Sequence, residues 1–475
     1  MSIDASRRNF LLRSGLGFGS LAATFILNAA EVKNPLAARK PILPATAKSV
    51  IFLFMHGGPS SLETFDPKPL LEKLNGLPVP DSFGDVQLQF STFKQVPILA
   101  SRRKFQKYGQ AGLEISDVFP HVAQQADKLA VIRSCQHDGF THTAALNWLN
   151  NGWPRLGRPS VGSWITYGLG SESENLPAFV VMLDGGIKSG PPVYGPGFLP
   201  AAYQGTVLRN GPSPILNVRP PDTRSASNQK DLRELLQWYN QQHLAPRSDD
   251  TDLAARMASY ELAFKMQMAA PELADLSKET AATQALYGMD EERTAPFGSK
   301  CLMARRLVER GVRFVQLWSG STTGGGDWDG HAQCDKGIVS MAGKVDKPIA
   351  GLLADLESRG LLDSTLVVWG GEFGRTPTSD GSANGGGDSQ GRDHNPYGFS
   401  IWMAGGGVRG GKVIGSTDEI GLRAVEYPVH VHDLHATMLS LMGLDHEKLT
   451  YLFQGRDFRL TDVAGKTELA SRLKA

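Results

Sequence analysis

Short, unbroken apolar runs, each followed by a polar turn and then by a helical pattern, recur along this chain of 475 residues. Runs of this kind, rich in β-branched and aromatic residues, predict buried strands. Strands that alternate with helices favour a mainly parallel sheet, because a parallel return needs a crossover connection. The sequence therefore predicts an α/β fold, a mainly parallel sheet sandwiched by helices. The expected strands are 49–55, 129–133, 178–183, 313–317, 365–369 and 398–403.

Helices are expected where apolar residues recur at helical spacing. A helix predicted at 143–150 would follow the second strand directly, behind a turn crowded with polar side chains. The other expected helices are 115–125, 229–243, 252–268, 298–310, 345–360 and 434–442. We expect one large α/β domain over 49–475, because a chain of this length can bury a large core.

Charge and cysteine content exclude several classes of function. The chain has 49 basic and 48 acidic residues, a net charge of +1, and no basic stripe, so nucleic acid is not an expected partner. Cys135, Cys301 and Cys334 are far apart, which gives neither a disulfide framework nor a zinc-binding CxxC pattern.

The N-terminal segment resembles an export signal. Ser6–Leu12 contains a twin-arginine pattern, and a weakly apolar run rich in glycine and alanine follows from Gly15 to Ala30. We therefore expect a Tat-type signal at 1–30, a linker at 31–48, the Tat translocase as a partner during export, and a periplasmic or extracellular location. No later segment has the length of apolar sequence that a membrane span needs.

Residues 185–221 are rich in glycine and proline and show little periodicity. They predict a long surface excursion, of the kind that often serves as a lid or a substrate wall.

Polar side chains cluster where the expected strands end. In an open α/β sheet these ends lie at one edge, which is where such sheets bind ligands. Mixed imidazole and carboxylate groups suit zinc, manganese or iron better than calcium, so one or two divalent ions among these four form the expected cofactor. The candidates are His56, Glu63, Asp66, His142, Asp327, Asp329, His331, Glu372, Asp393 and His394.

Two arginines and two threonines complete the candidate site. Arg375 and Arg392 could hold the anionic group of an ester, while Thr141 or Thr143, before or at the start of a helix, could supply a hydroxyl nucleophile. The alternative for the whole group is a salt-bridged network of loops between strands. For the threonines it is a helix N-cap.

Three further histidines, His430, His432 and His435, lie at a strand-to-helix junction beside Asp433. We interpret them as structural, with Asp433 as a helix cap.

Several motifs resemble those of the DUF1501 family of exported bacterial proteins. They are SRRNFLL, HGGPSSLETFDPKP, GVRFVQLW, DWDGH, LLDSTLVVWGGEFGRTP, GRDHNPYGFSIWMAGGGVRGG and a C-terminal stretch that begins VHDLHATML. The family is described as sulfatase-like and is placed in the alkaline phosphatase superfamily. The resemblance extends over nearly all of the chain after the signal segment.

The resemblance implies a set of metal ligands. A ligand at the end of the first strand falls on His56, and a DxxxH pattern falls on Asp327 and His331, with Asp329 as a competing choice. A later carboxylate falls on Glu372, and the last histidine on His394. The hydroxyl nucleophile of the superfamily implies Thr141 or Thr143, because neither Cys135 nor Cys301 lies in the Cys-x-Pro-Ser-Arg pattern of type I sulfatases.

These observations lead to one expected function and one alternative. The first is an exported, metal-dependent hydrolase of a sulfate or phosphate ester, with a small molecule or a polysaccharide as the anionic substrate. The alternative is a non-catalytic exported binding or assembly module that keeps the same fold.

Overall fold

The computed structural model describes residues 35–88, 93–209, 226–247, 272–322, 326–380 and 389–475, together with a few positions between 253 and 266. The expected signal segment at 1–30 and most of the expected helix at 252–268 lie outside these residues. Within the described residues, no helix combines the length and the apolar character that a membrane crossing requires.

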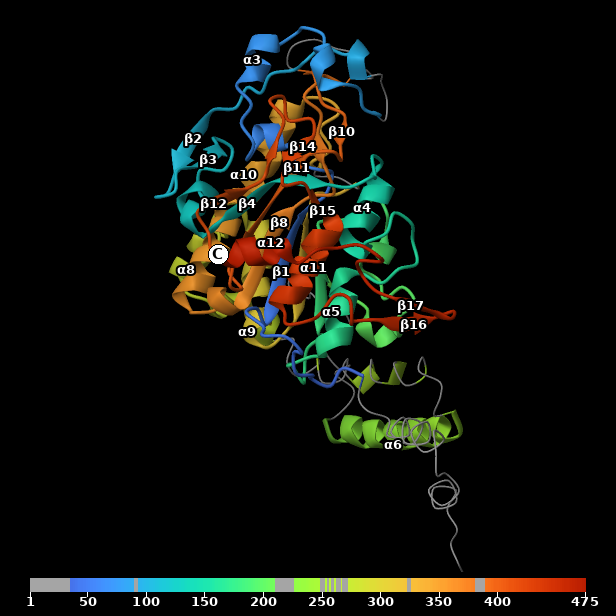
Figure 1. The fold of residues 1–475 in the computed structure, drawn as a ribbon. Coiled ribbons are helices and arrows are strands. Elements are labelled where there is room, and N and C mark those ends of the chain that lie inside the picture. The colour runs from blue at the N-terminus through green and yellow to red at the C-terminus, as the bar shows by residue number, and fades with distance from the viewer. Residues whose placement is uncertain are drawn as a thin grey trace, which may run out of the picture.

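A nine-stranded sheet forms the centre of the molecule, in the order β12-β4-β11-β8-β1-β7-β5-β6, with β15 paired to β4 (Figure 1). All six expected strands are confirmed, and three short strands add to them. The bounds are β1 (Ser49–Met55), β4 (Ala130–Gln136), β5 (Phe179–Met182), β6 (Thr206–Leu208), β7 (Phe314–Ser319), β8 (Thr365–Gly370), β11 (Phe399–Ala404), β12 (Lys412–Ile414) and β15 (Val429–His430).

The sheet is mainly parallel, as expected, and the one reversed strand is important for the site. β1 pairs in parallel with both β7 and β8. β11 runs antiparallel to β4 and to β8, so Phe399 at its start lies opposite Cys135 near the end of β4. The leading end of β11 therefore reaches the edge of the sheet at which its neighbours end.

Helices cover both faces of the sheet, because side chains along each strand point alternately to two separate cores. On β1, Ile51 and Leu53 belong to the core under α9 and α10, while Phe52 and Phe54 belong to the core under α4, α5 and α11. The helices are α3 (Leu70–Leu74), α4 (His142–Asn151), α5 (Val161–Leu169), α6 (Ala226–Leu244), α8 (Ala281–Leu286), α9 (Ala295–Glu309), α10 (Cys334–Ser358), α11 (Val431–Leu441) and α12 (Glu468–Lys474).

Two-stranded ribbons lie outside the main sheet, and α6 lies apart from the sheet and its covering helices (Figure 1). The ribbons pair β2 (Phe105–Tyr108) with β3 (Leu113–Ser116), β9 (Gly374–Arg375) with β10 (His394–Asn395), β13 (Ser416–Thr417) with β14 (Ala424–Glu426), and β16 (Tyr451–Phe453) with β17 (Arg456–Phe458).

The helix expected at 115–125 was wrong. Leu113–Ser116 is strand β3, and a 3₁₀ helix follows only at Val122–Lys128. Pro120 lies between them, and proline in the interior of an α-helix removes a hydrogen bond and clashes with the preceding turn.

The stretch expected as a surface excursion is described up to residue 209. It contains 3₁₀ helices at Pro191–Tyr194 and Ala201–Tyr203 and then strand β6, which pairs in parallel with β5. Val193 and Tyr203 are buried, so this part of the stretch contributes to the core.

Candidate metal centre

Side chains from five parts of the chain converge at one edge of the sheet. His56 follows β1, Asp329 and His331 follow β7, Glu372 follows β8, and His394 precedes β11. The reversed direction of β11 explains how a residue before a strand meets residues that come after strands. His142, the first residue of α4, reaches the same edge from the turn that follows β4.

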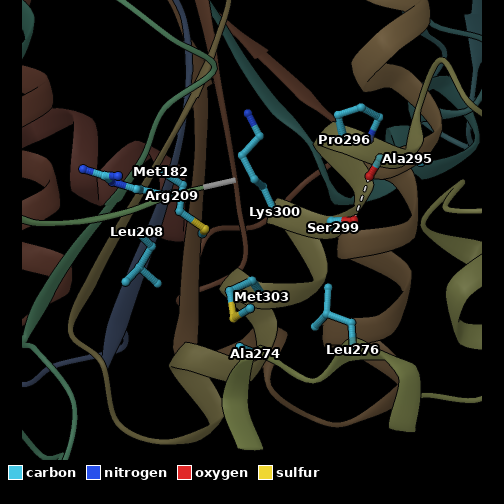
Figure 2. A pocket seen from close by; sticks show the side chains of 10 residues that line it. All are labelled: Met182, Leu208, Arg209, Ala274, Leu276, Ala295, Pro296, Ser299, Lys300 and Met303. Carbon is cyan, nitrogen blue, oxygen red and sulfur yellow. Dashed lines mark hydrogen bonds between the residues drawn. The ribbon is translucent and has the colours of Figure 1, made fainter. Parts of the chain in front are cut away.

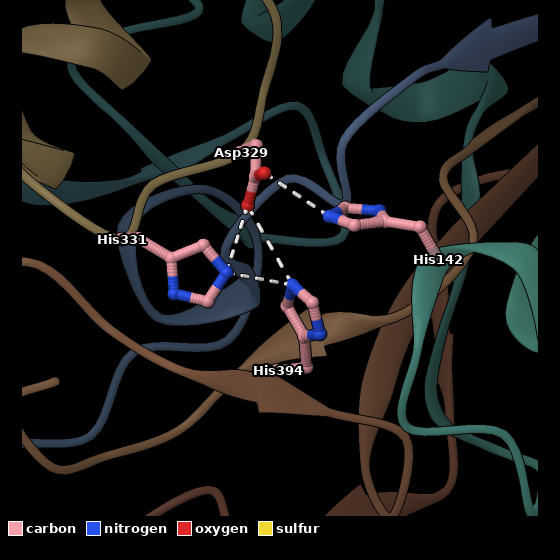
Figure 3. Close-up of side chains that lie close together, drawn as sticks. All are labelled: His142, Asp329, His331 and His394. Carbon is pink, nitrogen blue, oxygen red and sulfur yellow. Dashed lines mark hydrogen bonds and ion pairs between the residues drawn. The ribbon is translucent and has the colours of Figure 1, made fainter. Parts of the chain in front are cut away.

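Four of these side chains form a compact group, His142, Asp329, His331 and His394 (Figure 3). Their ligand atoms all lie within 4.8 Å of one another. Nε2 of His331 lies 2.9 Å from Nε2 of His394 and 3.2 Å from Oδ1 of Asp329. The set offers three imidazole nitrogens and a carboxylate oxygen, which are donors that zinc, manganese and iron accept.

The two facing nitrogens are lone-pair donors. His394 donates from Nδ1 to the carbonyl oxygen of Phe140 at 2.8 Å, and His331 from Nδ1 to Oδ2 of Asp380 at 2.5 Å. In the neutral form each ring then has its lone pair on Nε2. Burial lowers the pKa of both rings, that of His394 to about 3. Two lone pairs at 2.9 Å repel each other unless a cation lies between them, so these residues fit a metal ion.

Asp329 is the central carboxylate of the group. Oδ1 accepts a hydrogen bond from Nη2 of Arg375 at 2.7 Å and lies 3.6 Å from Nε2 of His394. Oδ2 lies 3.1 Å from Nε2 of His142 and contacts the ammonium of Lys188. Although burial acts to raise it, the imidazoles of His142 and His394 and the charge of Arg375 hold the pKa of Asp329 well below its usual range.

His142 is held between two carboxylates. Its Nδ1 donates to Oε1 of Glu372 at 2.8 Å, and Oε1 also accepts from the backbone N–H of Gly57 at 2.9 Å. Burial acts to raise the pKa of Glu372, but the hydrogen bond from His142 and the electrostatic effects of His142 and His56 together outweigh it and lower that pKa to about 2. Burial acts to lower the pKa of His142, and the carboxylates of Asp329 and Glu372 raise it above its ordinary value.

His56 and Asp327 lie beside the group of four. His56 is fully buried, and its Nε2 accepts from the backbone N–H of Lys188 at 3.2 Å. Oδ1 of Asp327 accepts from the backbone N–H of Asp329 at 3.1 Å, and Oδ2 lies 3.5 Å from Nζ of Lys188. Of the two aspartates between which the sequence could not choose, Asp329 is the one that contacts the histidines.

The two arginines expected to hold an anion are bound to the protein itself. Arg375 donates to Asp329 and to the carbonyl oxygens of Gly57, Gly58 and Arg392. Arg392 donates through Nε and Nη2 to Glu63, at 3.1 and 2.7 Å, and through Nη1 to the carbonyl oxygen of Thr376. Both are buried.

Neither threonine belongs to the group of four. Thr141 is the N-cap residue of α4, but its side chain makes no capping hydrogen bond. Thr143, the second residue of α4, is exposed. Asp66 is also elsewhere: its carboxylate contacts Lys68 and Thr417.

Two residues of this centre were missed by the sequence analysis. Lys188 lies in the stretch without periodicity, where no pattern distinguishes one residue from another. Asp380, together with His331 and Asp393, forms a second group of ligand atoms within 4.8 Å of one another. Asp380 is eight residues beyond Glu372 in the polar loop that follows β8, so its place in that loop is the one signal the sequence carries for it.

The histidines near the C-terminus cap helices. His430 and Asp433 form a capping box at the start of α11, so Asp433 has the expected capping role. Nε2 of His435 donates to the carbonyl oxygen of Leu149 at 2.8 Å, and Nε2 of His432 to that of Gly152 at 2.9 Å. These carbonyls belong to the C-terminal end of α4, whose first residue is His142.

Two cavities in the described residues lie away from the group of four. One, of about 320 Å³, has Met182, Leu208 and Met303 on its walls and Lys300 beside them (Figure 2). The other, of about 590 Å³, includes Asp184 and Ser321. No residue of the candidate metal centre lines either cavity.

The sequence matches the family model described as "Protein of unknown function (DUF1501)" over residues 47–470, which confirms the family expected from the motifs. No curated protein matches it.

Three solved structures illustrate what the fold is similar to. They are a sulfatase from Pseudoalteromonas sp. (13% identity, TM-score 0.38, covering 96% of this chain and 75% of that chain), a lipoteichoic acid synthase from Listeria monocytogenes (8%, 0.33, 91% and 80%) and an alkaline phosphatase from the Antarctic bacterium TAB5 (12%, 0.31, 76% and 92%). With TM-scores this low, none of these likenesses carries a conclusion about this chain.

Proposed function

This chain belongs to the DUF1501 family, and we propose that it is an exported, metal-dependent hydrolase of a sulfate or phosphate ester. The observation that carries the proposal is the pair of imidazoles of His331 and His394, whose lone pairs face each other at 2.9 Å beside the carboxylate of Asp329. This arrangement is unfavourable without a cation and favourable with one.

We assign the metal to His331, His394 and Asp329, with His142 at the border of the same group. Nitrogen and carboxylate donors favour zinc, manganese or iron over calcium. A divalent ion there would supply positive charge that polarises an ester oxygen and stabilises the charge that develops on it. The metal would not be bound by His56, Asp327 or Glu372; these residues would hold the ligands in position.

His142 would transfer the proton. Its Nδ1–H donates a hydrogen bond to Glu372, and this bond orients the ring so that Nε2 faces the centre. When substrate binds, the N–H of Lys188 that faces His142 would turn to the anionic group of the substrate while the ammonium stays on Asp327 and Asp329, which frees the lone pair of Nε2. When water attacks the phosphorus or sulfur atom, Nε2 takes the proton of the water. The bond to the leaving oxygen breaks, and that oxygen receives the proton. His142 is a better candidate for this role than Thr141 or Thr143, because its side chain already contacts Asp329 and Glu372.

We propose Lys188 as the cation that meets the anionic group of the substrate, in place of Arg375 and Arg392. The side chain of Lys188 is 23% exposed, whereas that of Arg375 is 1% exposed. Arg375 would act through Asp329, and Arg392 through its ion pair with Glu63. The substrate would be a small molecule or a polysaccharide that carries the ester.

The proposal also includes the export signal, the domain organisation and the location that were expected from the sequence. We propose that residues 1–30 act as a Tat-type signal, that 31–48 link it to a single domain over 49–475, and that the protein works in the periplasm or outside the cell. Folded export would suit a protein that acquires its metal before it is exported.

The alternative, a non-catalytic binding or assembly module, is favoured by one observation. Both arginines that could have held an anion are occupied by protein atoms. Such a module could hold the same metal and turn over no ester.

The test is the metal content per mole of chain after purification without chelator, compared with that of His394→Ala. We expect bound zinc, manganese or iron in the wild type and its loss in the variant, with an unchanged circular dichroism spectrum. His121→Ala is the matched control, because His121 also pairs with an aspartate but lies 48% exposed and away from the centre. A His394→Ala protein that keeps its metal would contradict the assignment.

A measurement of ester hydrolysis then distinguishes a metal-dependent enzyme from a non-catalytic binding module. The loaded wild type should hydrolyse aryl sulfates or aryl phosphates in a screen of both classes. If the metal is present and no ester of either class is hydrolysed, the binding module is the better description.

A further inference from the structure

Lys188 occupies a position that is built for a cation. Its Nζ lies 2.8 Å from Nε2 of His142 and 3.5 Å from Oδ2 of Asp327, and it contacts Oδ2 of Asp329. Two carboxylate oxygens and an imidazole nitrogen are the donors that a divalent metal would accept. Here the same three donors surround an ammonium group that belongs to the chain.

The carboxylate of Asp329 divides the centre into two sides. Oδ1 faces the imidazoles of His331 and His394, at 3.2 and 3.6 Å. Oδ2 faces His142 and Lys188. A carboxylate that bridges two cation positions in this way is the arrangement of a two-metal centre, with one of the two positions filled by a lysine.

The backbone holds Lys188 in place. Its N–H donates to Nε2 of the fully buried His56 at 3.2 Å. Two residues earlier, the carbonyl oxygen of Gly186 accepts from the backbone N–H of Thr322 at 2.9 Å, which ties this loop to the loop that carries Asp327 and Asp329. The ammonium therefore reaches the centre from a loop that is hydrogen-bonded at Gly186 and at Lys188.

We infer that this centre holds a single divalent metal, at His331, His394 and Asp329, and that Lys188 permanently occupies a second cation position of the same centre. The inference rests on the proposed metal site and deepens it, because it fixes the number of metal ions. An ammonium carries half the charge of a divalent ion, so it halves the Coulomb repulsion that a second metal would exert on the first.

The site is thus a centre with one metal ion, in which the ammonium group of Lys188 supplies the second positive charge. The protein needs one ion instead of two, and the position next to the substrate is occupied at any metal concentration. It also means that removal of one side chain should create a second metal site from ligands that are already in place.

The experiment measures metal equivalents per chain by elemental analysis after equilibration with zinc or manganese and removal of the free ion. We expect about one equivalent in the wild type and about two in Lys188→Ala, which frees Asp327, Asp329 and His142 as ligands. The double variant Lys188→Ala/Asp327→Asn should return to about one. Lys68→Ala is the matched control, because Lys68 also pairs with a buried aspartate, Asp66, away from the centre.

Lys188→Arg keeps the positive charge and should stay at about one equivalent, which covers the case in which Lys188→Ala does not fold. Two equivalents in the wild type, or two in Lys188→Arg, would overturn the inference. One equivalent in both the wild type and Lys188→Ala would overturn it and leave the proposed metal site intact. A wild type that binds no metal would overturn the proposed function as well, so the two failures are distinguishable.

Discussion

The carboxylate of Asp380, which lies outside the DWDGH motif, orients the imidazole of His331. Oδ2 of Asp380 accepts from Nδ1 of His331 at 2.5 Å, on the side of the ring opposite the centre. A partner of this kind fixes the tautomer and raises the basicity of a metal-binding histidine. At the proposed metal site, Asp380 would thus affect the metal through another residue.

Asp380→Asn should weaken metal binding roughly 10- to 100-fold, because a neutral amide holds the ring less firmly and makes it a weaker donor. Competition against a chelator of known affinity measures the change. Asp346→Asn is the matched control, since Asp346 binds Nδ1 of His121 at 2.7 Å far from the centre. Equal metal affinity in Asp380→Asn and the wild type would refute this role.

Residue types in the sequence predicted which side chains would lie together at this edge of the sheet, but not the contacts of each member. The pattern of histidines and carboxylates after strand ends identified His331, Asp329 and His394, because strand ends of one sheet meet at one edge. It could not choose between Asp327 and Asp329, since both fit the spacing. It assigned Arg375 to a substrate because arginine binds anions, whereas backbone carbonyls take up most of its donors.

At the scale of elements, the turn after β1 holds the loops of the centre together. Gly57 has φ of +114°, and a Cβ there would lie 2.5 Å from the backbone nitrogen of Asp329. Its own N–H donates to Glu372 at 2.9 Å. Only glycine permits this conformation and this approach at once. The turn thus connects the ends of β1, β7 and β8.

Gly57→Ala should lower metal affinity and destabilise the fold by more than the roughly 1–3 kcal/mol that the backbone conformation alone costs, because the loop carrying Asp329 must also move. Gly76→Ala separates the two effects, since Gly76 has φ of +80° but nothing within 4 Å of an added Cβ. Denaturant unfolding and metal titration of both variants give the comparison. If Gly57→Ala resembles Gly76→Ala in both measurements, the close approach of Gly57 to Asp329 contributes neither to stability nor to metal affinity.

Element prediction worked where apolar runs were long and failed where they were short. The expected strand at 49–55 has the bounds of β1, because seven successive buried residues leave little choice. Thr206–Leu208, which forms β6, is too short to stand out in a stretch rich in glycine and proline. Helix α10 starts at Cys334, eleven residues before the expected start at 345, because Gly337 and Gly343 obscure its periodicity.

For the whole molecule, buried neutral histidines predict acid sensitivity. Burial lowers the pKa of His435 to about 3 and that of His137 to about 4, from 6.5 when unfolded. Both pKa values are depressed in the folded state, so unfolding takes up protons below pH 6.5. Stability is complete above that pH and is lost as the pH falls toward 4. At pH 5 each histidine should cost about 2 kcal/mol.

Urea unfolding at pH 7.5 and pH 5 measures this loss. His435→Gln keeps a donor for the carbonyl oxygen of Leu149 but does not titrate, so its stability should fall less between the two pH values than that of the wild type. His121→Gln, at a half-exposed histidine, serves as the control. Equal losses in His435→Gln and the wild type would contradict the prediction.

The reversed strand β11 has a consequence for the order in which the protein becomes functional. His394 meets the loop after β7 and the start of α4 only after β11 has paired with both β4 and β8, so the proposed ligands at 142, 329, 331 and 394 come together late. Contacts between residues so distant in sequence form slowly, since long loops must close first. If the proposed centre binds its ion tightly, metal retained in the presence of a chelator would report that the central sheet has assembled. An intermediate without β11 in place would lose the ion to the chelator.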